Sequence, residues 1–370
     1  MKILFANFHP SDGGGRTTYI YELAKKISNT HKVFIVSPRT STLNKKARDL
    51  LNVTVIDMDV YEKEFKYFIH LLHCIRLLVR LINQEKFDVI HVNDLADHRL
   101  ILYISWIMLK KIPIILTKHN TVSLLSFGDW IRSKFTCATI AVCESVQKNL
   151  QTSVYKNKPI FCIPKGVDIN FYKPNKDYLF FYKNQFKDKN ITFVSVSGTS
   201  SYKGWHYLIA AVANMPYIKR KLIKIIIAGE MPDDFIKEKY VNRLGLRDQV
   251  IFSGLVEDVR DIISKGDVGF VLSDSIETTS FACREMMAMG KPVLISDYSE
   301  LPENIDDGIN GWITKAGDIE SIKNKLCWII DNPEKIFEMG VNARMKAVSE
   351  FSIEKYINKT LHVYKLCKFR

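Results

Sequence analysis

Short apolar runs alternate with longer amphipathic segments along the whole chain. In the first half these runs are rich in β-branched residues, and we expect strands at residues 2–7, 32–37, 52–58, 87–93, 112–120 and 139–144. The segments between them carry apolar positions at helical spacing, as residues 17–27 do. Such alternation is typical of βαβ units around a buried parallel sheet.

The second half repeats the scheme, with strands expected at residues 191–198, 224–229, 249–254, 268–273 and 291–296. The segment IPKGVDINFYKPN, residues 163–175, contains two prolines and a glycine and is the expected join. The end of the chain, residues 351–366, has the pattern of an amphipathic helix. We therefore expect an α/β protein with two parallel-sheet domains, 1–170 and 171–350, followed by a C-terminal helical segment, 351–370.

Composition supports two buried cores. The chain has 370 residues, 47% of them hydrophobic, which excludes extended disorder. Its seven cysteines are scattered and contain no CxxC pair, as expected of reduced cysteines. The first residues are predicted to form a strand, and we expect no signal peptide before it. We therefore expect a cytoplasmic protein.

Positive charge is concentrated in the first half. Of the formal net charge of +13, residues 1–173 carry +11, from 25 Lys and Arg against 14 Asp and Glu. A surface of this kind favours an anionic partner, and the first half is the part expected to meet it.

Residues 65–82, FKYFIHLLHCIRLLVRLI, are nearly long enough to cross a membrane, but basic residues interrupt them. Arg76 and Arg80 lie four apart, on one helical face. Three interpretations remain open: a half-buried helix, a basic amphipathic helix on a membrane surface, and a membrane span.

The stretch ETTSFACREMMAMGKPVLIS, from Glu277, combines two acids with a helix start. Ser280 is a suitable N-cap for a helix from Phe281 to Met289, with Gly290 past its end. Because this helix follows a buried strand, its first amides are expected to point out of the carboxyl edge of the sheet. They would form an anion site.

The amides concerned are those of Phe281, Ala282 and Cys283. Glu285 lies one turn below Phe281 on the same face and can accept hydrogen bonds from the paired hydroxyls of a sugar. Glu277 precedes the helix on the same loop. The alternative is that both acids are solvated groups favoured by the helix dipole.

Several motifs resemble, in order and spacing, those of the retaining GT-B glycosyltransferases of family 4. The Glu-x7-Glu motif is followed by EMMAMGKPVLISD and LPENIDDGINGWI, where the family has E-A-M-A-x-G-x-P-V-V and G-x-x-E-x-V-x-x-G-x-N-G. IPKGVDINFYKP resembles the family's linker, and KILFANFHPSDGGGRTTYIYELA its first strand and glycine loop. The resemblance implies two Rossmann-like domains with an interdomain cleft, and a C-terminal helix that crosses back to the first domain.

The resemblance also implies roles for individual residues. Glu285 would hold the ribose of a nucleotide, and Glu277 would contact hydroxyls of the donor sugar. Lys203, in SSYKGW, would neutralise the leaving diphosphate, and His119, in LTKHN, would face the donor sugar. The remaining implied donor contacts are the backbone of Phe281 and Ala282 at the diphosphate, of Gly14 and Gly15 at a phosphate or sugar, and of Leu255 and Val256 at the base.

The sequence departs from the family pattern at several positions. Gly198 stands where the family has an arginine five residues before the lysine, so one cation is missing unless Arg16 or another basic residue replaces it. Thr278 and Ser280 replace glycines of the E-G-F-G motif, and Lys165 stands where the linker has asparagine.

Other polar residues carry less information. Without the resemblance, we interpret His119 as a histidine of the core and His91 as one at the edge of the core. For His9, beside the glycine loop, a structural and a functional role are equally compatible with the sequence. The triple glycine is not G-x-G-x-x-G, which disfavours a dinucleotide oxidoreductase. No cluster has metal-ligand spacing, so we expect no catalytic metal and no cofactor besides the donor substrate.

Together, the motifs, the composition and the resemblance predict a retaining, hexosyltransferase-type enzyme. It would move a sugar from a nucleoside-diphosphate sugar, with a UDP sugar the first candidate, to a glycan or lipid-linked acceptor in lipopolysaccharide or other cell-surface polysaccharide synthesis. The basic first half favours peripheral contact with an anionic membrane, at the cytoplasmic face of an inner membrane. Alternatives are an epimerase or phosphorylase on the same fold, a non-catalytic nucleotide-sugar-binding subunit and, from charge alone, a nucleic-acid binder; we expect no nucleic-acid partner.

Overall fold

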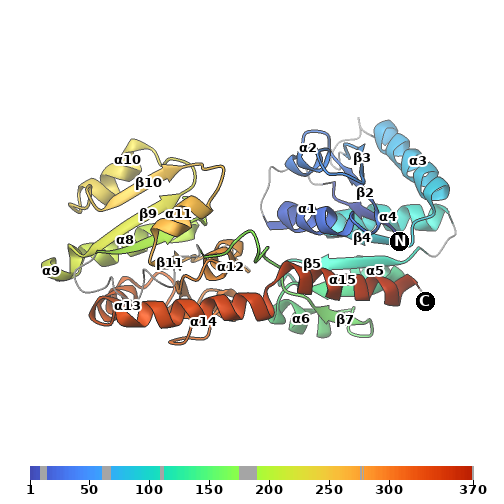
Figure 1. The fold of residues 1–370 in the computed structure, drawn as a ribbon. Coiled ribbons are helices and arrows are strands. Elements are labelled where there is room, and N and C mark those ends of the chain that lie inside the picture. The colour runs from blue at the N-terminus through green and yellow to red at the C-terminus, as the bar shows by residue number, and fades with distance from the viewer. Residues whose placement is uncertain are drawn as a thin grey trace. The chain divides into compact units, whose positions relative to one another are not determined.

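The computed structural model describes residues 1–8, 15–60, 68–108, 112–174, 190–275, 277 and 279–368. The chain divides into two compact units. Unit 1 comprises Met1–Lys165 and Tyr356–Arg370, and unit 2 comprises Gly166–Lys355. Each unit is built on one parallel sheet with helices around it (Figure 1). The expected α/β fold with two Rossmann-like sheets is confirmed.

Unit 1 contains a seven-stranded sheet in the order β3-β2-β1-β4-β5-β6-β7, and all neighbouring strands are parallel. The inner strands β1, β4 and β5 are almost completely buried, as their continuous apolar sequences predict. The strands are β1 (Lys2–Ala6), β2 (Lys32–Ser37), β3 (Val53–Asp57), β4 (Val89–Val92), β5 (Ile114–Lys118), β6 (Thr136–Ala141) and β7 (Ile160–Cys162).

The helices of unit 1 lie on both faces of this sheet. Right-handed crossovers place α1 and α2 on one face and α3, α4 and α5 on the other, because the chain reverses direction across the sheet after β3. In agreement, α1 packs beside α2, and α4 packs beside both α3 and α5. The helices are α1 (Gly15–Ile27), α2 (Thr42–Ala47), α3 (Phe68–Glu85), α4 (Leu95–Ile107), α5 (Phe127–Phe135) and α6 (Glu144–Gln151).

The C-terminal helix α15 (Ile353–Lys368) starts in unit 2, and from Tyr356 onward it belongs to unit 1. A buried polar contact holds it there. The Tyr364 hydroxyl lies 2.5 Å from Nδ1 of His91, whose Nε2 lies 2.6 Å from Oγ1 of Thr117 on β5. Burial lowers the pKa of His91 to about 3, so the imidazole is neutral. Here His91 has a structural role, as expected from its position in a buried strand.

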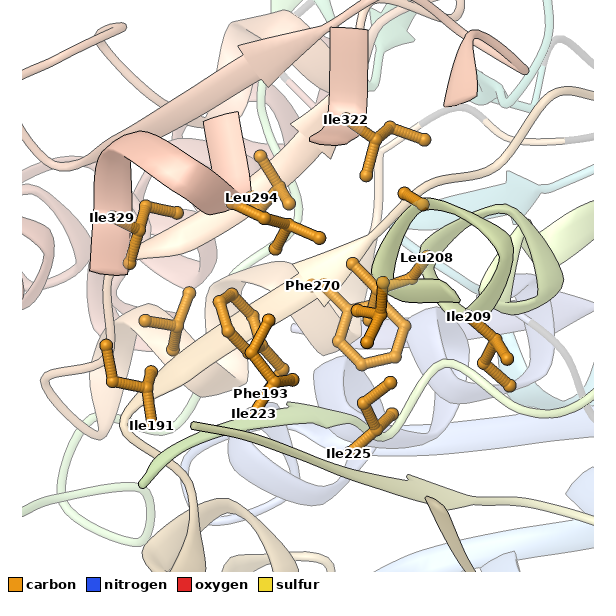
Figure 2. Close-up of a cluster of buried hydrophobic side chains, with 14 of the residues drawn as sticks. Ile191, Phe193, Leu208, Ile209, Ile223, Ile225, Phe270, Leu294, Ile322 and Ile329 are labelled. Carbon is orange, nitrogen blue, oxygen red and sulfur yellow. The ribbon is translucent and has the colours of Figure 1, made fainter. Parts of the chain in front are cut away.

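Unit 2 contains a six-stranded parallel sheet in the order β10-β9-β8-β11-β12-β13. Figure 2 shows part of its core, where Phe193 and Phe270 of the sheet pack with Leu208 and Ile209 of α8. The strands are β8 (Ile191–Ser195), β9 (Ile223–Ala228), β10 (Val250–Gly254), β11 (Val268–Val271), β12 (Val293–Ser296) and β13 (Gly311–Thr314).

The helices of unit 2 cover both faces of the sheet, with α8 and α13 packed together on one face and α12 and α14 packed together elsewhere in the unit. They are η2 (Ser201–Lys203), α8 (Trp205–Ala213), α9 (Tyr217–Arg220), α10 (Asp234–Lys237), η3 (Glu238–Asn242), α11 (Arg260–Lys265), α12 (Phe281–Ala288), η4 (Leu301–Asn304), α13 (Ile319–Asp331) and α14 (Glu334–Glu350).

The helix expected at residues 65–82 corresponds to α3, and its first three residues lie outside the described part of the chain. Leu78 and Ile82 are buried, whereas Arg76 and Arg80 are exposed, so both arginines lie on the solvent face as the spacing predicted. Among the described residues, no helix is long and apolar enough to cross a membrane. This excludes the membrane span for the described part of α3.

Candidate functional site

The candidate site of unit 2 lies where the strand order reverses. β8 is followed along the chain by β9 on one side, whereas its neighbour on the other side is β11. Ligands of open parallel sheets bind at the carboxyl ends of such a pair of strands, because the loops diverge there and leave a crevice. The loop after β8 carries Lys203, and the loop after β11 carries Glu277.

Lys203 is held by a tight turn. It ends the short helix η2, and Gly204 follows with φ of +70°. A Cβ at position 204 would lie 1.8 Å from the carbonyl oxygen of Leu272, so only glycine fits. The amide of Asp274 donates to the carbonyl of Tyr202 over 3.1 Å. These contacts fasten the lysine loop directly to the loop after β11.

Lys203 and Glu277 form an ion pair. The Nζ of Lys203 donates to Oε2 of Glu277 over 2.7 Å, and the two side chains are 17% and 11% exposed. The hydroxyl of Ser273 donates to the same oxygen over 3.4 Å. The sequence named both residues but gave no sign that they touch, because they are separated by 74 positions.

Helix α12 begins at Phe281, as predicted, and ends at Ala288, one residue earlier than expected. Ser280 is the N-cap, and its hydroxyl accepts a hydrogen bond from the Cys283 amide over 3.3 Å. The expectation that the Cys283 amide is available to an anion is therefore wrong, because the cap already uses it. The amides of Phe281 and Ala282, at the first two helical positions, keep the geometry in which helix starts bind anions.

The other donor candidates lie at the same edge of the sheet. Glu285 is partly buried on α12, one turn after Phe281. Leu255, directly after β10, is 79% exposed, whereas Val256 packs against the core. Because β9 lies between β10 and β8, these two residues follow a strand that is two positions from the strand preceding Lys203. Among the candidate residues of unit 2, Lys203 and Glu277 are in direct contact.

In unit 1, Gly14 lies outside the described residues and Gly15 is the first residue of α1. His119 follows β5 at the carboxyl edge of the sheet and is buried. Its Nε2 lies 3.5 Å from Oδ1 of Asn93, and the ring of Tyr19 meets it edge-on with centroids 5.0 Å apart.

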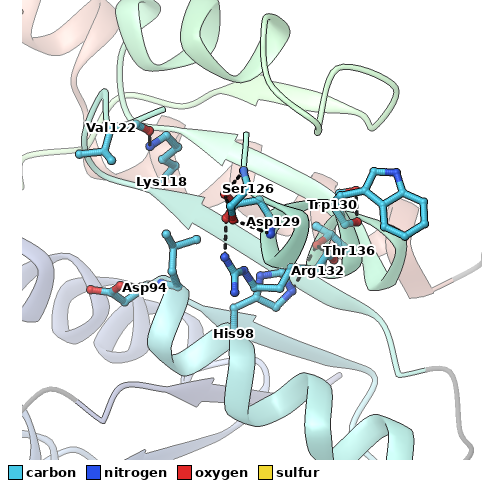
Figure 3. Close-up of polar contacts among 11 residues, drawn as sticks. Asp94, His98, Lys118, Val122, Ser126, Asp129, Trp130, Arg132 and Thr136 are labelled. Atoms are coloured by element: carbon cyan, nitrogen blue, oxygen red, sulfur yellow. Dashed lines mark hydrogen bonds and ion pairs between the residues drawn. The ribbon is translucent and has the colours of Figure 1, made fainter. Parts of the chain in front are cut away.

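A cavity of about 100 Å³ opens beside His119, lined by Asn93–Leu95 and Leu116–Asn120 with Val122. The sequence analysis did not select Asn93 and Lys118, both of which line it. Lys118 is buried and donates to Oδ1 of Asn120 over 3.0 Å and to the carbonyl of Val122 over 2.6 Å (Figure 3). Burial lowers its pKa to about 8. The signal that could have found them is a polar residue at the carboxyl end of each of two successive buried strands.

A second set of polar contacts in Figure 3 involves α5 and the residues that flank it. Ser126 and Asp129 form a capping box at the helix start, and Asp129 also accepts from Arg132. The ring of His98 lies 3.2 Å from Oγ1 of Thr136. Burial lowers the pKa of His98 to about 3, so this histidine is neutral and structural.

Two family models match the chain in succession. One, described as Glycosyltransferase Family 4, matches residues 13–171, and the other, Glycosyl transferases group 1, matches residues 179–346. The chain belongs to the family 4 glycosyltransferases. Full-length relatives agree with this assignment. The N-acetyl-alpha-D-glucosaminyl L-malate synthase of Bacillus anthracis is 23% identical over 368 residues, which cover 96% of this chain and 94% of that protein.

Solved structures show that this glycosyltransferase has the GT-B fold. A glycosyltransferase from Rickettsia africae superposes with a TM-score of 0.83 at 19% identity, over 99% of this chain and 98% of that one. HepE of Anabaena, crystallised with UDP, gives a TM-score of 0.78 at 20% identity, over 99% of this chain and 100% of that one.

Gly198 is the position at which the family's motif pattern has an arginine. This residue has φ of +94°, a backbone conformation that side chains rarely adopt. Gly229 packs directly against it, since a Cβ at position 229 would lie 2.8 Å from the Cα of Gly198. That close approach requires glycine at position 229, whereas a Cβ at position 198 would have no neighbour within 4 Å. At Gly198 it is the positive φ alone that disfavours an arginine. Arg16, the suggested replacement, lies at the start of α1 in unit 1, and its side chain is outside the described set.

Among the described residues, no three His, Cys, Asp or Glu side chains are grouped to hold a metal ion. Lys203 supplies a cationic group to the unit 2 site.

Proposed function

We propose that this glycosyltransferase transfers a hexose from a nucleoside-diphosphate sugar, with retention at the anomeric carbon, to a glycan or lipid-linked acceptor in lipopolysaccharide or other cell-surface polysaccharide synthesis. The observation that carries the donor class is the Lys203–Glu277 pair beside the start of α12. A cation and two helix amides suit a diphosphate, and two carboxylates, Glu277 and Glu285, suit sugar hydroxyls.

The chemistry required of the protein is mainly charge stabilisation. As the bond between the anomeric carbon and the diphosphate oxygen breaks, negative charge grows on that oxygen, and Lys203 with the Phe281 and Ala282 amides would stabilise it. Glu277 would accept hydrogen bonds from the donor sugar, and Glu285 from the ribose. The oxygen of the acceptor hydroxyl forms a new bond to the anomeric carbon. The proton of that hydroxyl leaves with the diphosphate. In unit 1, His119 would donate to or accept from a sugar hydroxyl.

The donor base is proposed to be uracil, because HepE was crystallised with UDP and shares the fold over its full length. A thermal-shift panel with UDP, GDP, ADP and CMP sugars tests this proposal. We expect the largest stabilisation from UDP sugars, and a smaller one in Lys203→Met. No shift with any nucleotide sugar would contradict the donor class, and a shift with another base would contradict UDP alone.

One observation favours a second candidate, a nucleotide-sugar-binding protein without transferase activity. Gly198 removes a cation from the leaving-group site, and the positive φ there disfavours its return. Slow hydrolysis of the bound donor in the absence of acceptor, lost in Lys203→Met, would support the enzyme. Tight donor binding with no turnover, with or without membrane extracts that contain acceptors, would support the binding protein.

The acceptor is proposed to lie at an anionic membrane. The basic first half of the sequence and the exposed Arg76 and Arg80 on α3 support this part of the proposal.

A further inference from the structure

Two neighbouring helices of unit 1 expose aromatic stripes. On α4, the exposed residues Tyr103, Trp106 and Ile107 lie on one side of the helix. On α5, the exposed Phe127 and Trp130 likewise share one side. The rings of Phe127 and Trp130 stack, with centroids 5.8 Å apart. Because α4 packs beside α5, the two stripes belong to one face of the sheet.

Helices α1 and α2 of the same unit carry no such stripe among their described residues. On the opposite face, the exposed side chains of α1 and α2 are polar, such as Thr18, Lys25 and Lys45. Of the five tryptophans, Trp205 and Trp312 are buried, whereas Trp106 is 68%, Trp130 47% and Trp328 of unit 2 42% exposed. Clustered exposed aromatic residues mark an interaction surface more strongly than single ones do.

Basic groups accompany the aromatic residues. The Nζ of Lys134 lies 5.0 Å from the ring centroid of Trp130, and Lys158 donates to the carbonyl of Lys134 over 3.5 Å. Figure 3 shows Trp130 pointing away from the buried polar contacts of α5. Aromatic rings accompanied by lysines favour the interface of a bilayer, where the rings lie at headgroup level and the lysine ammonium groups reach water and phosphates.

A cavity of about 430 Å³ opens between the same helices at the amino ends of β5, β6 and β7. Its lining includes three buried residues, Ser105 of α4, Ile114 and Cys367. It also includes the exposed Lys134 and the half-buried Lys158. It lies at the sheet edge opposite His119, because His119 follows the carboxyl end of β5. The cavity is therefore separate from the candidate site.

We propose that the α4–α5 face, defined by Tyr103, Trp106, Ile107, Phe127, Trp130 and Lys134, binds an anionic lipid bilayer. Trp106 and Trp130 enter the headgroup region. Lys134 and Lys158 contact a lipid phosphate, and the cavity receives that headgroup and the first part of its chains. α3, with its exposed arginines, packs beside α4 and extends the basic surface. This inference rests on the proposed function only in taking the acceptor to be membrane-linked.

Vesicle flotation of the full-length protein tests the proposal. We expect binding to phosphatidylglycerol–phosphatidylcholine vesicles at low salt and release at about 0.5 M NaCl, where charge is screened within a few Å. Trp106→Ser with Trp130→Ser should abolish binding. Lys134→Glu with Lys158→Glu should weaken the partition coefficient by about 5-fold or more per lysine, since each basic residue contributes about 1 kcal/mol at an anionic surface.

Matched controls come from unit 2. Trp328→Ser removes an exposed tryptophan, and Lys224→Glu with Lys265→Glu reverses two exposed lysines; neither should change flotation. In a Trp328→Phe background, brominated lipid should quench the fluorescence of the protein. Cys137→Phe, which fills the cavity, should weaken binding without lowering the melting temperature.

Three results would overturn the proposal. The first is no binding of the wild type to anionic vesicles. The second is unchanged binding of the tryptophan and lysine variants while charge reversal of Arg76 and Arg80 abolishes it. The third is a dimer in sedimentation that the tryptophan variant dissociates, because the face would then serve a second copy of the chain. UDP-sugar binding without lipid reports the donor site independently, so failure of the proposed function is distinguishable from failure of the membrane face.

Discussion

The ammonium of Lys203 lies 2.7 Å from a carboxylate oxygen of Glu277, and this pair joins the loops that follow β8 and β11. Both side chains are largely shielded from water, so neither charge is strongly screened. In the absence of a ligand, the charge of each group is thus balanced by the other. A diphosphate that approaches Lys203 has to compete with Glu277 for it.

This competition predicts opposite effects of two substitutions. Glu277→Gln keeps the shape but removes the competing charge, so UDP should bind about 5-fold more tightly, a change of about 1 kcal/mol. Sugar transfer or donor hydrolysis should nevertheless fall, because the sugar loses a charged acceptor. Lys203→Met should weaken UDP binding. Calorimetry with UDP measures the affinity of each variant. Equal weakening of UDP binding in the two variants would refute the competition between Glu277 and the diphosphate.

Glu285→Ala should weaken binding of the UDP sugar by roughly 2–4 kcal/mol, because the ribose hydroxyls lose a charged acceptor. The exposed Glu350 of α14 provides a control, and Glu350→Ala should leave binding unchanged. Calorimetry at constant pH is the measurement. An unaltered affinity in Glu285→Ala would remove the ribose role.

Gly204→Ala should lower the free energy of unfolding by at least about 2 kcal/mol, because the new Cβ overlaps the Leu272 carbonyl and φ is +70°. Gly308 is the matched control. Its φ is +76°, but a Cβ there has no neighbour within 4 Å, so Gly308→Ala should cost only the backbone strain, about 1 kcal/mol. Urea unfolding measures the loss of unfolding free energy in each variant. Equal losses in both variants would show that the close contact with Leu272 contributes nothing.

Donor turnover should survive EDTA. The physical reason is that Lys203 and the start of α12 together supply the positive potential that the leaving diphosphate needs. The measurement is donor hydrolysis or transfer after chelation and gel filtration. Loss of activity that Mg²⁺ or Mn²⁺ restores would show that this account of the leaving group is wrong.

Because Lys118 is buried, we expect it to make the free energy of unfolding depend on pH in the alkaline range. Its pKa falls from 10.5 to about 8 in the folded protein, so between these values the unfolded chain binds more protons than the folded one. The contribution of Lys118 to the free energy of unfolding therefore rises with pH across this window, by on the order of 2 kcal/mol. Lys118→Met should lack the rise.

Unfolding of the two proteins at about pH 7 and about pH 10 provides the comparison, because over this range the folded protein loses the proton of Lys118 while the unfolded chain largely keeps it. Lys148→Met, which removes an exposed lysine from α6, controls for general alkaline effects. Parallel stability curves for wild type and Lys118→Met would contradict the assignment.

Local sequence determined much of the architecture. The inner strands were predicted from continuous apolar runs, because burial on both faces leaves no polar alternation. The start of α12 was predicted from Ser280, since an N-cap acts within three residues. By contrast, β7 and β13 were not predicted. Both are short strands at a sheet edge, where one neighbour suffices and the pattern is weak.

The tertiary structure alone decided which charged groups meet. Lys203 and Glu277 come from different βα units, and only the placement of β11 beside β8 brings their loops together. The burial of Lys118 and the exposure of Trp106 were likewise unpredictable from their neighbours in sequence, because each depends on which helix or strand packs alongside. Periodicity is a property of ten or so consecutive residues, whereas a site is assembled from loops that the order of strands makes adjacent.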